Sequence, residues 1–166
     1  MNITELNEKI AKITFDTKVA LVNYFNHKMD MVSHPLVTHE FDSKFRVWFT
    51  MDATASLARN ICFSDNVMVN YSDHSHNRFV SLTGLARLCK DPEEKNKHIV
   101  HTNKNSMLKR FTDQVWLICF EPEKIEFWDY NNEQYVQYLK FGATTVLHSE
   151  KELKTLPKYA TPSDVN

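Results

Sequence analysis

The chain has 166 residues, of which 42% are hydrophobic and 25% are charged, and its formal net charge is −1. These values are typical of a globular protein, and we expect one domain over residues 1–166. A nearly neutral charge without a long basic run argues against a nucleic-acid partner. No apolar run approaches the about 18 residues of a membrane span, and the polar N-terminus is unlike a signal peptide. We therefore expect a cytoplasmic protein.

Two scarce residue types exclude further classes of protein. The three cysteines, Cys62, Cys89 and Cys119, form no CxxC pair. We therefore expect reduced thiols, and neither a disulfide framework nor a zinc knuckle. The only glycines are Gly84 and Gly142, which argues against a glycine-rich phosphate loop.

Hydrophobic periodicity predicts the elements in chain order. Apolar residues at helical spacing predict an amphipathic helix over residues 3–13. Four extended segments, separated by polar turns, are expected to be strands: 18–25, 31–41, 45–51 and 66–72. The Ala-rich segment 53–60 predicts one or two helical turns. Because proline has no N–H for a ladder, Pro35 must lie at an edge or a bulge of its strand.

The second half of the chain continues the same pattern. A long strand is expected at 78–88. The run Asp91-Pro92-Glu93-Glu94 is typical of a helix start, with an Asx cap, a proline and acids in the first turn. One or two helices are therefore expected over 92–110. Two more strands are predicted at 114–122 and 124–129. The tail from about residue 131 has no firm prediction.

These elements predict a fold class. At least six strands of similar length are joined mostly by short turns, and the helices are separate from the run of strands. That arrangement favours an α+β fold. We predict an antiparallel β-barrel of six or more strands with flanking helices.

The order of the segments is similar to that in a known family. The runs VALVNY, SHPLV, VWFTMDATAS, NVMVNYSD, RFVSLTGLARL and LICFEPEKIEFWD resemble the pyridoxamine 5′-phosphate oxidase-like family of FMN-binding split barrels, and its general stress protein branch in particular. The resemblance covers roughly residues 10–130 and rests on the order of motifs that are individually weak. It implies a split β-barrel, bound FMN, and a homodimer with the cofactor at the two-fold interface.

The resemblance also implies a set of flavin contacts. FMN needs apolar surface for its ring, and N–H, hydroxyl or cationic donors for its phosphate. The strand residues implied beside the ring and the ribityl chain are His34, Pro35, Leu36, Val37, Phe49 and Thr50. The residue types alone favour a simpler interpretation of Leu36 and Val37 as core residues, and Thr50 could equally cap a turn.

The phosphate site is where the sequence departs from the family pattern. Counting from Thr50, the family's usual Ser and Lys fall on Thr54 and Ser56, so a hydroxyl is kept but a positive charge is lost. The N–H groups at the start of the short helix and Arg59 are the available replacements, although Arg59 is equally consistent with an exposed helix residue. Because a charge-assisted hydrogen bond contributes roughly 1.5–3 kcal/mol, we expect FMN binding to be weak, to favour another flavin form, or to be absent.

Trp128 ends the run KIEFWD. A strand-end tryptophan is usually a half-buried core residue with its N–H bonded, whereas in the family the similar tryptophan comes from the second subunit and contacts the flavin. Both interpretations stay open. Where true pyridoxamine phosphate oxidases carry the Arg and His that handle the substrate, this chain has Gln134 and Val136. We therefore expect no oxidation of pyridoxamine 5′-phosphate.

Two histidine pairs have a spacing compatible with metal binding, His74 with His76 and His98 with His101. Both lie in polar stretches without a carboxylate or cysteine at a telling distance. Solvated side chains are the favoured interpretation, and no metal is predicted.

Three functions remain open. The first is a flavin-dependent oxidoreductase of the general stress protein type, and the second is a cofactor-binding protein without turnover. The third is a degenerate split barrel that serves as a dimeric interaction module. The ordered motifs favour the first two functions, and the missing lysine at Ser56 favours the last two. The sequence indicates no catalytic residue, electron donor or substrate.

Overall fold

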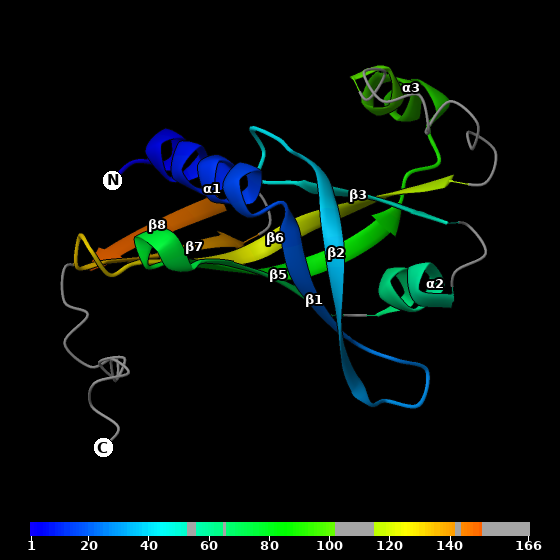
Figure 1. Ribbon diagram of the computed structural model, residues 1–166, viewed down its shortest axis with the longest axis horizontal. Coiled ribbons are helices and arrows are strands. Elements are labelled where there is room, and N and C mark those ends of the chain that lie inside the picture. The colour runs from blue at the N-terminus through cyan, green and yellow to red at the C-terminus, as the bar shows by residue number, and fades with distance from the viewer. Residues whose placement is uncertain (53–55, 65, 102–114, 142–143, 151–166) are drawn as a thin grey trace.

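The computed structural model describes residues 1–52, 56–64, 66–101, 115–141 and 144–150 (Figure 1). The helices in this part of the chain are α1 (Ile3–Thr17), α2 (Ser56–Phe63) and α3 (Pro92–His101), with a 3-10 turn at His74–His76. The strands are β1 (Val19–Phe25), β2 (Met31–Phe41), β3 (Val47–Asp52), β4 (Val67–Asp73), β5 (Arg78–Leu88), β6 (Val115–Asp129), β7 (Gln134–Phe141) and β8 (Thr144–Glu150).

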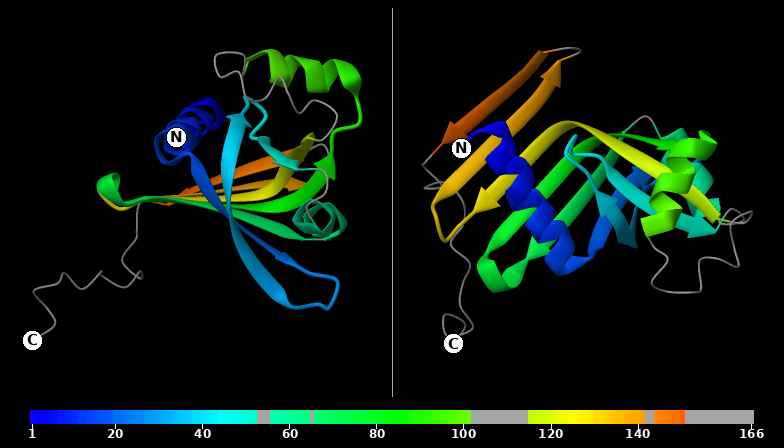
Figure 2. Two further views of the ribbon diagram at one scale, coloured as in Figure 1. Left: turned by 45° about the vertical axis from the view of Figure 1, so that its right-hand side comes forward. Right: turned by 90° about the horizontal axis from the view of Figure 1, so that it is seen from above.

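All of these strands belong to one antiparallel sheet with the order β3-β2-β1-β4-β5-β6-β7-β8. An additional pairing of β3 with β6 closes the first six strands of that order into a barrel. The β7 and β8 strands extend the sheet beyond the barrel (Figure 2). The predicted α+β fold, an antiparallel barrel of six or more strands with flanking helices, is confirmed.

The elements differ from the sequence prediction in two places. The strands expected at 114–122 and 124–129 are one continuous strand, β6. Its register with β5 shifts between Thr83 and Gly84, so the strand continues through Pro122 instead of ending there. The described part of the tail, which had no firm prediction, forms β7 and β8, and these two strands pair with each other. The helical region expected over 92–110 is described only as far as the end of α3, and the rest lies outside the described residues.

The core lies between α1 and the inner face of the barrel. Leu6, Ile10 and Ile13 recur at helical spacing and are fully buried. The helix lies across one face of the sheet (Figure 2), and it begins with a capping box in which Asn2 and Glu5 bond each other's backbone N–H. Cys62, Cys89 and Cys119 are free thiols. Burial raises the pKa of Cys119 to about 12, so this thiol stays protonated.

Pro35 lies where its missing N–H costs no hydrogen bond. The N–H of Thr38 donates to the carbonyl of Lys18 at 2.8 Å. Because hydrogen-bonded and non-bonded pairs alternate along an antiparallel ladder, the Leu21–Pro35 pair is non-bonded and the Pro35 nitrogen faces away from β1. Pairing of β2 with β3 starts only at Thr38, so within the described residues this side of Pro35 is an open edge. The expected edge position is confirmed.

An ionic cluster fixes the turn between β4 and β5. The Asp73 carboxylate accepts hydrogen bonds from Ser75 at 2.7 Å and from His76 and the Arg78 guanidinium at 3.0 Å. Arg78 also faces Asp16 of α1 at 3.8 Å. Burial alone would raise the pKa of Asp73, but these hydrogen bonds and the charge of Arg78 outweigh it and hold that pKa well below its usual range.

The Asp73→Asn variant should be less stable by about 3 kcal/mol at neutral pH, because it leaves the Arg78 charge without its buried partner. A lowered folded-state pKa means that the carboxylate contributes fully above the ordinary aspartate pKa of about 3.9, and that its contribution is lost as pH falls through the lower folded value. Denaturant unfolding across this range should show the two proteins converging below about pH 4. A difference in stability that does not change with pH would contradict this role.

Gly84 allows β5 to pass close to β6. A Cβ placed on Gly84 would lie 2.1 Å from the carbonyl oxygen of Glu121 and 2.8 Å from the Cα of Pro122. These are backbone atoms and cannot move without disturbing the register. We expect Gly84→Ala to lower the free energy of unfolding by about 3 kcal/mol, measured by chemical denaturation, while the adjacent control Thr83→Ala stays near wild type. Equal stability of the two variants would refute this close approach.

Candidate functional site

Val37 and Thr50 lie on the outer face of the barrel, each one residue beyond the last pair of β2 and β3 before these strands separate. The last paired residues before the separation are Thr38 and Phe49. Both point inward: the Thr38 hydroxyl lies 2.6 Å from that of Tyr71, and Phe49 is in the core. Since side chains alternate along a strand, Val37 and Thr50 both point outward. Thr50 is half-buried, whereas Val37 is 67% exposed.

The other strand residues of the expected flavin site divide between the two faces. Pro35 is exposed on the outer face near Val37. Leu36 packs against the core and Phe49 is buried in it. The interpretation as core residues is thus confirmed for Leu36 and wrong for Val37. His34 is half-buried on the inner side.

His34 has a partner that the sequence did not indicate. The hydroxyl of Tyr24 on β1 lies 3.2 Å from His34 Nδ1, and the two rings stack with their centroids 5.8 Å apart. Burial raises the pKa of Tyr24, so its phenol stays protonated and can donate to the histidine. The register that pairs Val22 with His34 brings these side chains together, and only the hairpin register could have indicated the contact.

The residues expected at the FMN phosphate follow β3. Thr54 lies outside the described residues, and so does the side chain of Ser56, the first residue of α2. Arg59, one turn further along α2, is exposed. Within the described residues of α2, Arg59 is therefore the cation that is accessible to solvent.

Trp128 lies far from these residues within one chain. Thr50 pairs with Leu117 near the start of β6, and Trp128 is eleven residues farther along the same strand. An extended strand covers roughly 35 Å over that length. Trp128 is half-buried, and its ring lies 5.6 Å from that of Tyr135. One copy of the chain therefore cannot bring Thr50 and Trp128 to the same small ligand.

Gln134 and Val136 stand where true pyridoxamine phosphate oxidases carry the Arg and His that handle the substrate, and neither can take over that role. The side-chain oxygen of Gln134 accepts a hydrogen bond from the Lys9 ammonium at 3.0 Å. Val136 is fully buried in the core. Neither side chain is a cation that could hold an anionic substrate.

The outer face also carries apolar residues that the sequence analysis did not single out. On β1, Val19 and Leu21 are 47% and 46% exposed, and they pair with Val37 and Pro35 of β2. Met68 of β4 is exposed on the same face. The sequence did carry a sign of this apolar outer face. In the run VALVNYF, the residues directed to both faces of the strand are apolar apart from Asn23, and such a run is typical of a strand that is covered on both sides.

The donor set can be compared with what FMN requires. Exposed Pro35 and Val37 provide apolar surface for a ring, and Thr50 provides a hydroxyl beside it. Arg59 provides a cation for a phosphate. The residue types of this set match what FMN requires of a site.

The two histidine pairs have different environments. His74 and His76 are exposed, as expected for solvated residues. His98 is only 7% exposed, so the expectation of a solvated side chain is wrong at this position. The side chain of His101 lies outside the described part of the chain.

No helix among the described residues is long and apolar enough to cross a membrane.

Comparisons with solved structures agree with the barrel. An FMN-binding protein from Nostoc punctiforme, described as related to pyridoxamine 5′-phosphate oxidase, has a TM-score of 0.73 at 10% identity and covers 90% of this chain and 99% of its own. PhzG from Burkholderia lata, solved with tetrahydrophenazine-1-carboxylic acid, has a TM-score of 0.68 at 12% identity, covering 89% and 91%. General stress protein 26 from Bacillus anthracis has a TM-score of 0.58 at 22% identity, covering 74% and 93%. At these identities the likeness concerns the fold.

Comparison at the level of sequence gives the family. No curated protein matches the chain. Residues 5–152 match the family model described as pyridoxamine 5′-phosphate oxidase like, which is most of the chain. The chain therefore belongs to the pyridoxamine 5′-phosphate oxidase-like family.

Proposed function

We propose that the chain binds FMN on the outer face of the barrel where β2 and β3 separate, and that it is a flavin-dependent oxidoreductase of the general stress protein type. The observation that carries this proposal is that exposed Val37 and half-buried Thr50 lie on one face where β2 and β3 separate, with α2 as the next described element of the chain. The family match and the FMN-binding neighbour support it. Bound FMN would supply hydride or electron transfer.

Each residue of the proposed site has a defined task. Pro35 and Val37 exclude water from one face of the ring. The Thr50 hydroxyl orients the ribityl chain. Arg59 and the hydroxyls of Thr54 and Ser56 bind the phosphate, together with backbone N–H groups at the start of α2. His34, Leu36 and Phe49 support this strand region from inside the barrel.

The proposed site is completed by a second copy of the chain. Trp128 lies too far from Thr50 to reach it in the same chain, so its proposed flavin contact requires a homodimer. The exposed apolar face formed by Val19, Leu21, Val37 and Met68 is the surface that such a dimer would cover. Two-fold pairing would bring two equivalent sites to one interface.

A second candidate function is a non-catalytic split barrel that holds a cofactor or a partner chain. The observation in its favour is Ser56, which stands where the family usually has a lysine. The visible spectrum of the purified protein with added FMN tests for binding. Reduction of the bound flavin by NADH or NADPH separates the oxidoreductase from a cofactor-binding protein without turnover.

The Ser56→Lys variant tests the phosphate position. A cation beside the FMN phosphate should tighten FMN binding about tenfold, or on the order of 1–2 kcal/mol. The gain should shrink with added salt because part of it is screened Coulomb attraction. Riboflavin lacks the phosphate and serves as the matched ligand control, so its affinity should not change. Titrations followed by flavin fluorescence measure all four affinities, and an equal response of both ligands would show that the phosphate position is wrong.

The assembly is tested by a charge on the outer face. Wild type should have twice the mass of the 19.5 kDa chain in multi-angle light scattering. Leu21→Asp should be largely monomeric, because a dimer would have to desolvate its carboxylate without a partner. The control Phe141→Asp alters an equally apolar and 61% exposed residue on β7 and should stay dimeric. A monomeric wild type would contradict both the dimer and the role of Trp128.

A further inference from the structure

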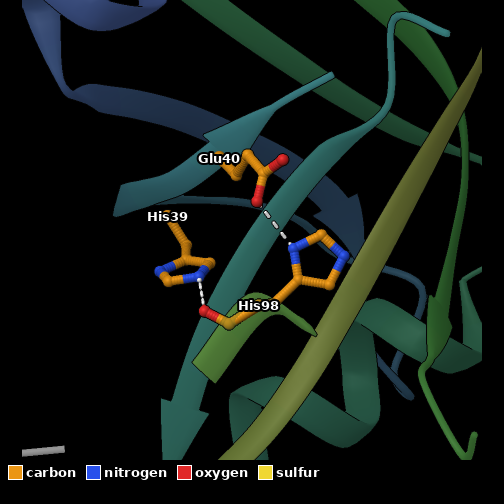
Figure 3. Close-up of side chains that lie close together, drawn as sticks. All are labelled: His39, Glu40 and His98. Carbon is orange, nitrogen blue, oxygen red and sulfur yellow. Dashed lines mark hydrogen bonds and ion pairs between the residues drawn. The ribbon is translucent and has the colours of Figure 1, made fainter. Parts of the chain in front are cut away.

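A cluster outside the flavin site joins β2 to α3. His39 and Glu40 come from β2 and His98 comes from α3. Figure 3 shows the Glu40 carboxylate directed at the His98 ring and the His39 ring directed at the backbone carbonyl of His98. Each offers one potential metal ligand, and these atoms all lie within 4.8 Å of one another. The Glu40 carboxylate lies 2.7 Å from His98 Nδ1, and His39 Nε2 donates to the His98 carbonyl at 2.9 Å.

A β-bulge makes this cluster possible. In a regular strand, adjacent residues such as His39 and Glu40 point to opposite faces. Here the register with β3 passes from Thr38–Phe49 to Glu40–Trp48, so β2 has one extra residue, His39. The bulge turns both side chains toward the same helix. Such bulges are common where a strand re-aims a functional side chain.

The surroundings of His98 restrict its ring. The side chain is buried, and its ring lies 4.0 Å from that of Trp48. The Glu94 carboxylate lies 3.9 Å from His98 Nε2, beyond hydrogen-bonding distance. Arg46 is the nearby cation, and it is already paired with Asp42 at 2.6 Å and with Glu94 at 3.6 Å. The His98 imidazole is thus held by an aromatic ring on β3 and by the Glu40 carboxylate on β2.

We propose that His39, Glu40 and His98 bind one divalent transition-metal ion, with zinc as the best chemical match. Two imidazoles and one carboxylate suit zinc and its neighbours in the first transition row, whereas magnesium and calcium prefer oxygen ligands. Ligand atoms on a tetrahedral zinc ion lie about 3.3 Å apart. The Glu40–His98 pair at 2.7 Å therefore has to separate slightly to admit the ion, and any pair of ligand atoms near the 4.8 Å limit has to approach.

The proposed site has one position open for a ligand that is not protein. Three protein ligands leave the fourth zinc position to water or a small molecule, as in catalytic rather than structural sites. His39 and Glu40 line a hollow of about 570 Å³ between α1 and β2. Two of the three proposed ligands therefore border this solvent-open hollow, and His98 approaches them from α3. This inference does not depend on flavin binding.

Zinc titration of the metal-free, full-length protein tests the proposal. Calorimetry should show one zinc ion per chain, and bound cobalt should give a visible absorption band. Excess magnesium should not compete. Glu40→Gln and His98→Gln should each weaken zinc binding by about 100-fold or more, since loss of a residue that only orients a ligand already costs about 10- to 100-fold. His39→Gln should also weaken binding, and it changes a residue that is only half-buried.

Matched controls distinguish metal binding by this cluster from a purely structural role, in which its hydrogen bonds only hold α3 against β2. Glu123→Gln on β6 and His148→Gln on β8 alter exposed residues of the same types and should leave zinc affinity unchanged. Zinc should raise the midpoint of thermal unfolding of wild type and of both controls, but not of the Glu40 variant. If a folded His39→Gln or Glu40→Gln protein binds zinc like wild type, or if wild type shows no saturable one-to-one binding, the proposal is overturned.

Discussion

The pairing of β3 with β6 is the constraint on which the rest of the structure depends. Residues Val47–Asp52 lie opposite Val115–Phe120, and this ladder closes a six-stranded barrel. Because β3 must reach β6, it leaves β2 at Thr38. The separation of β2 from β3 is thus a direct result of closure. Because of this separation, Val37 and Thr50 each lie one residue beyond the last pair of the two strands, on the outer face.

The same strand that closes the barrel also carries the extension beyond it. The first part of β6 pairs with β3, and the second part pairs with β7. Gly84 is what allows β5 to follow β6 past Pro122 between these two parts. Trp128 therefore belongs to the strand that closes the barrel and yet lies far from Thr50.

Periodicity predicted the strands because most of them have one face in the core. Val67, Val69 and Tyr71 alternate with polar residues, and all three are buried. Pro122 was misleading, because a proline inside an apolar run is usually a sign that a strand ends. The exposure of Val37 was beyond sequence reasoning as well, since an apolar residue in a strand gives no indication of where the neighbouring strand departs.

The histidine cluster was out of reach of sequence reasoning for a different reason. Glu40 and His98 are far apart in the chain, and the bulge at His39 breaks the alternation by which faces are assigned. Spacing along the sequence suggested His101 as the partner of His98, whereas the structure brings a residue of β2 to it. Contacts that depend on an extra residue in a strand become visible only once the register is known.

The open edge at Pro35 has a consequence for the behaviour of the chain in a crowded solution. An unpaired strand edge is a template on which an unfolded or foreign strand can add by backbone hydrogen bonds, and long apolar edges are sites of aggregation. The β2 edge before Thr38 is apolar at Met31 and Val37. Pro35 removes a donor from the middle of that edge, so an incoming strand cannot complete its ladder. Pro35 thus makes this exposed strand edge a poor template for the addition of another strand.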